Sequence, residues 1–515
     1  MLTTPRVHTP RVAAWRVLAS LFIVGLGLLP AACSASRPTD TPMLDTRNPE
    51  LRVNQRLEAA ELAWENAQTD PALRAKAREI FKSLVWSSET PRPLRLRLAE
   101  MLLLDASPEG LADSRSFTVL RLPTESDRAV VGMMALAAAT NNWTDAGPSL
   151  IRCLAEPLDD VDDRDRVESM ALQRLNPGRT LESIAFGYFS DPGVSAGPRE
   201  IGWGSRVQAD AWTLLSRLDP GGATRRELVR GTGAAAMGPS GPLLQVLRAG
   251  VDELGVIPST AMELEWLRSL RDRDDAKNAA WWQEVSSIVA TLGGPQREGL
   301  QLRHLEPLRI AAARSPGWLG AGRDELLLIL ADRLEGRAYN RRTAEIDGVK
   351  ANSRERLRDW ADSLAWGDAL SILVIDAAVA EPGIADAILK QAMLDREDRK
   401  TEYGGVLEAA DRGDGTPGPA RAVLFPPRPR DRVHDERFVA STDMIAYSDR
   451  AFAHYHLQVQ RPKNYEYAGP SGGDLRYARL SGRNCVVFTS LAADRLGVDY
   501  YQPDGAVIDL GEIPR

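Results

Sequence analysis

Histidine and cysteine are scarce in this chain of 515 residues, which holds five histidines and three cysteines. Cys33, Cys153 and Cys485 are too few for a disulfide framework, so at most one bridge could form. The formal net charge of −7 gives no basic field of the kind that binds nucleic acid. The apolar run from Val17 to Leu29 is shorter than the roughly 20 residues that a membrane-spanning helix needs.

The N-terminus has the features of an export signal. Arg6, Arg11 and Arg16 come before the apolar run, and Pro30-Ala-Ala-Cys33 follows it. This pattern resembles a bacterial lipoprotein signal peptide, which implies that residues 1–33 contain the signal and that Cys33 carries the lipid. We therefore expect an extracytoplasmic protein of the cell envelope, held to a membrane by its lipid anchor. Residues 34–50, rich in Ser, Thr, Pro and Asp, are expected to form a flexible tether.

Residues 51–365 are predicted to be an α-helical array. Apolar side chains recur at helical spacing, as at Leu94, Leu98, Met101 and Leu102, and Pro and Gly separate the segments. The sequence Arg174-Leu-Asn-Pro-Gly178 recurs as Arg217-Leu-Asp-Pro-Gly221, a separation of 217 − 174 = 43 residues. This spacing fits a HEAT-like solenoid, but two copies fit an irregular array equally well. Either form offers an elongated surface for a partner.

Most of the chemistry lies near the C-terminus, where two of the five histidines are two residues apart in Ala453-His454-Tyr455-His456-Leu457. On a β-strand, residues i and i+2 project from the same face about 7 Å apart, so these two imidazoles could share one metal ion. Catalytic zinc takes three protein ligands of this kind and leaves one position open. Asp474 can supply the third ligand, and Ser471 precedes it in a Pro-Ser-Gly-Gly-Asp turn that is expected to open a helix.

An upstream Glu, then His-x-His, then Ser-x-x-Asp resembles the signature of the JAB/MPN (JAMM) zinc metalloprotease family. Glu402-Tyr-Gly404-Gly405-Val-Leu407 fits the strand that carries the family's Glu. A helical segment with Ile384, Ala387, Ile388 and Ala392 on one face precedes it, and the segments 485–489 and 506–510 fit closing strands. The chain departs from the family at Leu457, where Pro is usual, and in a longer connection over residues 457–470.

The resemblance implies an α+β JAB/MPN-like domain over residues 366–515 and a Zn²⁺ site formed by His454, His456 and Asp474. It also implies hydrolysis of a peptide or isopeptide bond in a protein or peptide substrate, with Glu402 as general base for an activated water and Ser471 as a donor to the oxyanion. The alternative is a noncatalytic JAB-like scaffold that binds partners through its helical array. A third hypothesis is an envelope scaffold unrelated to this family.

Three smaller expectations complete the sequence analysis. Cys485 could be a nucleophile paired with His454 or His456, although its apolar neighbours favour a buried strand cysteine. The Gly- and Pro-containing stretch 411–432 is predicted to be a long hairpin loop. His434 lies close to that stretch in the sequence and could approach the site.

Overall fold

A computed structural model gives the fold of the chain. It describes residues 41–193, 202–232, 240–272, 274–351, 353–413, 415–432, 438–460, 463–492 and 494–513. The lipidation candidate Cys33 and the site candidate His434 lie outside the described residues. The chain divides into two compact units, one ending at Ser114 and the other running from Arg115 to Arg515.

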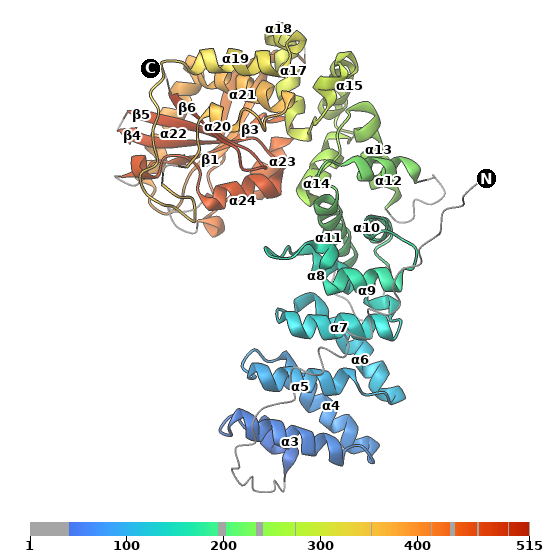
Figure 1. Cartoon of the computed structure of the whole chain (residues 1–515). Helices are drawn as coiled ribbons and strands as arrows, with labels where there is room; N and C mark the ends of the chain where they lie inside the picture. The colour runs from blue at the N-terminus through green and yellow to red at the C-terminus, as the bar shows by residue number, and fades with distance from the viewer. Residues whose placement is uncertain are drawn as a thin grey trace, which may run out of the picture. The chain divides into compact units, whose positions relative to one another are not determined.

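The first unit is helical (Figure 1). Its helices are α2 (Pro42–Arg47), α3 (Val53–Asn66), α4 (Pro71–Trp86), α5 (Arg92–Leu103) and the start of α6 (Pro108–Arg121). The predicted apolar face of α5 is buried, from Leu94 through Leu98 to Leu102. Helix α2 lies within the predicted tether, and the Arg56 Nε donates a hydrogen bond of 3.0 Å to the Thr46 carbonyl. Residues 42–47 are therefore folded helix.

The second unit begins with a long run of helices and ends in a sheet (Figure 1). The helices before the sheet are α7 (Arg128–Thr140), α8 (Gly147–Ala155), α9 (Val167–Leu175), α10 (Leu181–Ser190), α11 (Trp203–Leu218), α12 (Ala223–Gly231), α13 (Gly241–Glu253), α14 (Ala261–Leu270), α15 (Ala276–Thr291), α16 (Gly294–Arg297), α17 (Leu305–Arg314), α18 (Gly317–Gly320), α19 (Arg323–Leu334), α20 (Leu357–Trp360), α21 (Trp366–Val379) and α22 (Pro382–Glu397).

Local sequence explains where several of these helices begin. Asp70 accepts hydrogen bonds from the Ala72 and Leu73 amides at the start of α4, where Pro71 needs no amide partner. Thr260 and Glu263 form a capping box at the start of α14, each accepting from the other's backbone amide. These caps satisfy donors that have no partner within the helix.

The helices of the second unit pack mainly on helices close to them in the chain, as in the pairs α7 with α9, α8 with α11, α10 with α11 and α13 with α14. The two copies of the five-residue motif, 43 residues apart, span the ends of α9 and α11, but their arginines differ in role. Arg217 donates to the Ala155 carbonyl at 2.6 Å and to Asp163 at 2.7 Å, whereas Arg174 is exposed. This difference favours the irregular array over an exact repeat.

The sheet has six strands in the order β2-β1-β3-β4-β5-β6. Their bounds are β1 (Gly404–Asp411), β2 (Pro417–Leu424), β3 (Ala453–Gln458), β4 (Cys485–Ala492), β5 (Arg495–Tyr501) and β6 (Val507–Glu512). Strands β3 and β4 are parallel and every other pair is antiparallel. The parallel pair needs a crossover connection, and α24 (Gly472–Ser481) provides it. Another short helix, α23 (Thr442–Tyr447), precedes β3.

Helices cover both faces of this sheet. Tyr455 points to one face, where its hydroxyl donates to Gln391 of α22. The residues flanking Tyr455 point to the other face, where Ala478 of α24 packs in a cluster with Cys485 and Tyr501. The C-terminal region is thus an α+β fold with a mixed sheet, as the sequence predicted at that level.

One expectation about this region is wrong. The stretch 411–432 is not a single long loop, because residues Pro417–Leu424 form the edge strand β2, which pairs with β1 in antiparallel register. In the middle of this strand, Ala420 and Ala422 are half-buried and alternate with the exposed Pro419 and Arg421. Period-2 analysis of the sequence could have found this alternation.

A buried arginine joins the last helices of the array to the sheet. Arg303 is 4% exposed, and its guanidinium donates to Asp368 at 2.5 Å, Asn484 at 3.0 Å and Gln502 at 3.1 Å. Asn484 Nδ2 donates back to the Arg303 carbonyl at 2.9 Å. These bonds cross the predicted domain boundary at residue 365, which stays a prediction.

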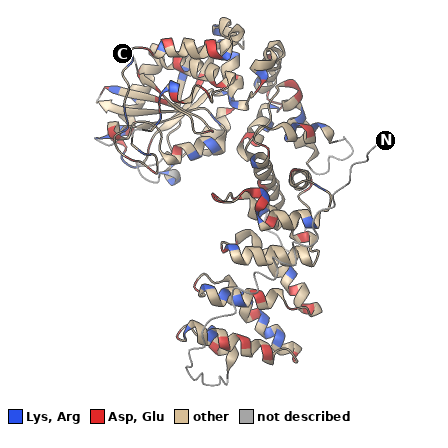
Figure 2. Ribbon diagram, in the orientation of Figure 1, with Lys and Arg blue, Asp and Glu red and all other residues tan. Residues whose placement is uncertain are grey.

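Charged residues of both signs are interspersed along the described helices (Figure 2). Among the described residues, the helices are each too short or too polar to cross a lipid bilayer.

We expect Asp368→Asn to destabilise the protein by about 3 kcal/mol, because the buried charge of Arg303 would lose the carboxylate that neutralises it. Burial raises the pKa of Asp368, but the charge of Arg303 and the bond from His304 outweigh it and hold the pKa below the usual range. The wild type should therefore lose stability as the pH falls below about 4, the pKa of an unfolded Asp, and the variant should lose less. Urea unfolding at pH 7, 5 and 3 measures both effects, and equal pH dependence would contradict the assignment.

Candidate metal centre

Strand β3 places the two histidines together. His454 and His456 project from the same face and are 3% and 2% exposed. His454 lies opposite Val406 on β1 and Cys485 on β4, and His456 lies opposite Gly404 and Val487. The predicted extended conformation and shared face of the His-x-His segment are confirmed.

The Ser-Gly-Gly-Asp turn opens α24 as predicted. The Ser471 hydroxyl accepts from the Asp474 amide at 3.2 Å, and Asp474 Oδ2 accepts from the Ser471 amide at 2.7 Å. This capping box fixes the two side chains relative to each other. It also brings Asp474 Oδ2 to 3.5 Å from His456 Nε2, so the helix start and the strand meet at that imidazole.

The His454 ring is held by one hydrogen bond. Its Nδ1 lies 2.7 Å from the Tyr477 hydroxyl, on α24, and its Nε2 is buried with no hydrogen-bond partner among the described residues. Burial, and then the positive charge of Arg483, lower the pKa of His454 well below its ordinary value. A neutral ring with Nδ1–H donated to Tyr477 leaves a lone pair on Nε2, which is the state that a metal ligand requires.

The His456 ring stacks on Phe438 with centroids 5.8 Å apart and meets Tyr501 edge-on. Burial lowers its pKa, but the negative charge of Asp474 and the bond to it act in the opposite direction, and the net shift is upward. Burial raises the pKa of Asp474, while the same pairing lowers it and prevails. Without a metal ion, His456 and Asp474 therefore stabilise each other's charged forms.

Glu402 lies just before β1, where Gly404 pairs with His456. It is half-buried, and its negative charge is among the causes that raise the pKa of His456. The two glycines that follow let the strands approach closely. A Cβ on Gly405 would lie 1.9 Å from the Val423 carbonyl oxygen, and one on Gly404 would lie 2.5 Å from the Tyr455 carbonyl oxygen.

The donor set fits zinc in its chemistry, because it consists of one carboxylate and two imidazoles, one of which has a buried nitrogen that lacks a partner. Over the part of the chain that the structure describes, however, no three His, Cys, Asp or Glu side chains lie close enough together to hold a metal ion. The pair His456 and Asp474 is assembled, and His454 stands on the same face with its Nε2 unsatisfied.

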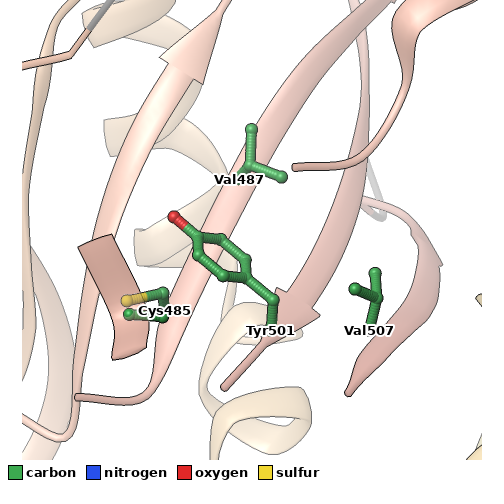
Figure 3. Packing of buried hydrophobic residues seen from close by; sticks show 5 residues of the cluster. Cys485, Val487, Tyr501 and Val507 are labelled. Atoms are coloured by element: carbon green, nitrogen blue, oxygen red, sulfur yellow. The ribbon is translucent and has the colours of Figure 1, made fainter. Parts of the chain in front are cut away.

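Cys485 lies in the core of this face. Its side chain is 1% exposed and clusters with Val487, Tyr501 and Val507 (Figure 3). Burial, and then the negative charge of Asp474, raise the pKa of its thiol far above the ordinary value. A thiol that stays protonated is a poor nucleophile, so the structure favours the buried strand cysteine.

Sequence reasoning missed a strap formed by residues 339–351 and 353–356, which lies across the site turn. Arg342 donates to the Pro470 carbonyl at 2.7 Å, and Arg476 of α24 donates to Asp347 at 2.9 Å. A Cβ on Gly472 would lie 2.0 Å from the Asp347 carbonyl oxygen, so only glycine fits beneath the strap. The sequence shows the arginine pair Arg341-Arg342 and the Asp347-Gly348 turn. It does not show that they contact the distant turn at Pro470 and Gly472.

Asp395 of α22 was also missed. It accepts a hydrogen bond of 3.3 Å from the Tyr403 amide, next to Glu402, and burial raises the pKa of its carboxyl to about 7. Its position depends on how α22 packs under the sheet, and no local motif marks it.

Comparison of the chain with known protein families, with curated proteins and with solved structures gave no match.

We expect Gly405→Ala to destabilise the protein by about 2 kcal/mol or more, because the added methyl group would collide with the backbone of β2. The matched control is Gly383→Ala near the start of α22, where a Cβ meets nothing within 4 Å. That control should be neutral or slightly stabilising. Thermal unfolding of both variants makes the comparison, and an unchanged Tm for Gly405→Ala would contradict the close strand contact.

Proposed function

We propose that the C-terminal α+β region is a JAB/MPN-like zinc hydrolase of peptide or isopeptide bonds. His454, His456 and Asp474 would hold the metal ion. The observation that carries the proposal is that a buried histidine with an unpartnered Nε2 and a His–Asp pair separated by 3.5 Å lie on one face of the sheet. A buried polar atom without a partner calls for an explanation, and a metal ion that binds there supplies one.

Two neighbours support the ligand roles. Tyr477 can accept the Nδ1 proton of His454 and so direct Nε2 toward a metal ion. The capping box holds Asp474 through the Ser471 amide at 2.7 Å, which leaves its other oxygen available. His454 and Asp474 thus each have a second contact that fixes their orientation.

When bound, zinc would polarise the scissile carbonyl and lower the pKa of the attacking water. Glu402, beside His456, would accept the proton of that water and return it to the leaving amine. The Ser471 hydroxyl oxygen already accepts from the Asp474 amide at 3.2 Å, so its own proton remains to be donated to the oxyanion that develops on the substrate. These roles need no covalent intermediate.

The proposal also covers where the protein acts and how its substrates reach the site. Cys33 would carry a lipid that holds the protein at the cell envelope, outside the cytoplasm. The helical array would present protein or peptide substrates to the site. No residue identifies a ubiquitin-like partner.

A second candidate is a noncatalytic JAB-like scaffold, in which the helical array binds partners. It is favoured by the finding that, in the described parts of the chain, three metal-binding side chains do not yet converge. It is also favoured by the His456–Asp474 pair, which is satisfied without a metal ion. Metal content separates this candidate from the first.

We expect the full chain to bind about one zinc ion, and His456→Ala and His454→Ala each to lose it, because a site with three protein ligands tolerates no missing one. Cys485→Ala, a change on the same sheet face, should keep the metal. Elemental mass spectrometry after zinc loading and dialysis measures the content. Full zinc stoichiometry in His456→Ala would refute the ligand assignment, and a metal-free wild type would favour the scaffold.

We expect Glu402→Gln to keep its zinc and to lower the rate of hydrolysis by about 10²- to 10⁴-fold, the usual contribution of a general base. The matched control is Glu408→Gln on β1, the strand that follows Glu402, whose carboxylate pairs with Arg421. A library of quenched fluorogenic peptides, read by fluorescence, supplies the substrates. Equal rates for Glu402→Gln and the wild type would remove Glu402 from the mechanism.

A further inference from the structure

A cavity of about 280 Å³ lies between the strap, α20 and the middle of β6. Half of its ten lining residues are arginines: Arg341, Arg342, Arg354, Arg356 and Arg358. Its volume is near the lower end of the range for ligand pockets, roughly 300–1,000 Å³, so it suits a single side chain or a small head group.

Arg342 forms the floor of this cavity and has one donor group unsatisfied. Its side chain is fully buried, with Nε donating to Glu355 at 3.2 Å and Nη2 to the Pro470 carbonyl at 2.7 Å. Its Nη1 has no hydrogen-bond partner among the described residues, and neither does the buried Nδ2 of Asn340, which also lines the cavity. Two unsatisfied buried donors at one cavity indicate an acceptor that binds there.

The charge of the cavity also favours an anion. Three acidic residues line it against the five arginines, namely Glu355, Asp359 and Asp509. Glu355 is paired with Arg342, and Asp509 accepts from the Asn340 amide at 3.0 Å. Arg341, Arg354 and Arg358 are exposed, and the structure shows no ion pair for them among the residues it describes. The lining therefore keeps an excess of positive charge at its mouth.

The cavity is connected to the candidate site through one hydrogen bond. Pro470, the acceptor of Arg342, immediately precedes Ser471. Gly469 before it adopts a φ of +90°, and a Cβ there would lie 2.7 Å from Arg342 Nη2. A group bound by Arg342 would thus lie close to the residue that is proposed to stabilise the oxyanion.

We propose that this cavity is a specificity pocket that binds an acidic side chain of the peptide substrate near the scissile amide. The inference rests on the proposed function for the identity of the ligand as a peptide. The arginines would pair with the carboxylate, and Arg342 Nη1 and Asn340 Nδ2 would donate to it. A carboxylate with charge-assisted hydrogen bonds of this kind is bound strongly and with defined geometry.

Binding is measured first, with the full chain and no added zinc. The probes are fluorescein-labelled tetraglutamate and the neutral tetraglutamine, read by anisotropy. We expect tetraglutamate alone to bind, and the variant Arg354→Ala/Arg358→Ala to bind it at least about tenfold more weakly, as the loss of a charge-assisted bond implies. The control Arg230→Ala/Arg268→Ala makes the same change in net charge at exposed positions elsewhere and should bind like the wild type.

Equal binding of the two peptides, or an equal loss in both double variants, would overturn the pocket. Inorganic phosphate that competes as well as free glutamate would also overturn it in favour of a general oxyanion site. These outcomes are independent of catalysis. A protein that binds tetraglutamate at the cavity but hydrolyses no peptide would keep the pocket and refute the hydrolase. A protein that hydrolyses peptides without any preference for acidic residues would keep the hydrolase and refute the pocket.

Discussion

The buried charge of Arg303 is the constraint on which the second unit depends. A guanidinium removed from water is stabilised only if its donors find partners, and here the partners come from α21, the start of β4 and the residue after β5. Asn484 returns a bond to the Arg303 carbonyl, and its own carbonyl accepts from the His454 amide at 2.9 Å. Asn484 thereby links the strand that carries the histidines to Arg303.

The candidate site follows from this placement and from backbone sterics. Gly404 and Gly405 have no Cβ that would collide with the backbones of β3 and β2, and Glu402 lies two residues before Gly404, the partner of His456. Helix α24 then closes the same face, with Tyr477 on one histidine and Asp474 on the other. Burial, and then the charge of Arg483, lower the pKa of His454, while the pairing with Asp474 outweighs burial and raises the pKa of His456. The pKa values of the two histidines of one strand therefore shift in opposite directions because their neighbours differ.

The sequence predicted what short-range geometry determines. The shared face of His454 and His456 needs only the period of a strand, and the Ser471–Asp474 cap needs only four residues. The family resemblance predicted the order of elements, which the α+β fold matches. The metal site that the resemblance also implies stays a prediction. The partners of Arg303 and Asp347 could not be predicted, because they lie 181 and 129 residues away in the sequence. Asp395 depends on helix packing in the same way.

Other contacts between residues far apart in the sequence also hold the last helices of the array against the sheet region. Trp266 of α14 donates to the Asp449 carbonyl at 2.8 Å, and Arg483 lies 3.3 Å above its ring. Arg483 immediately precedes Asn484, so two neighbouring residues of the loop that leads into β4 contact the array, Arg483 through Trp266 and Asn484 through Arg303. A sheet region cut at residue 365 would lose these partners and also Arg342, leaving Asn484 and the turn before Ser471 unsupported. The last helices of the array and the strap are therefore parts of the candidate site's framework, and a spacer role alone does not account for them.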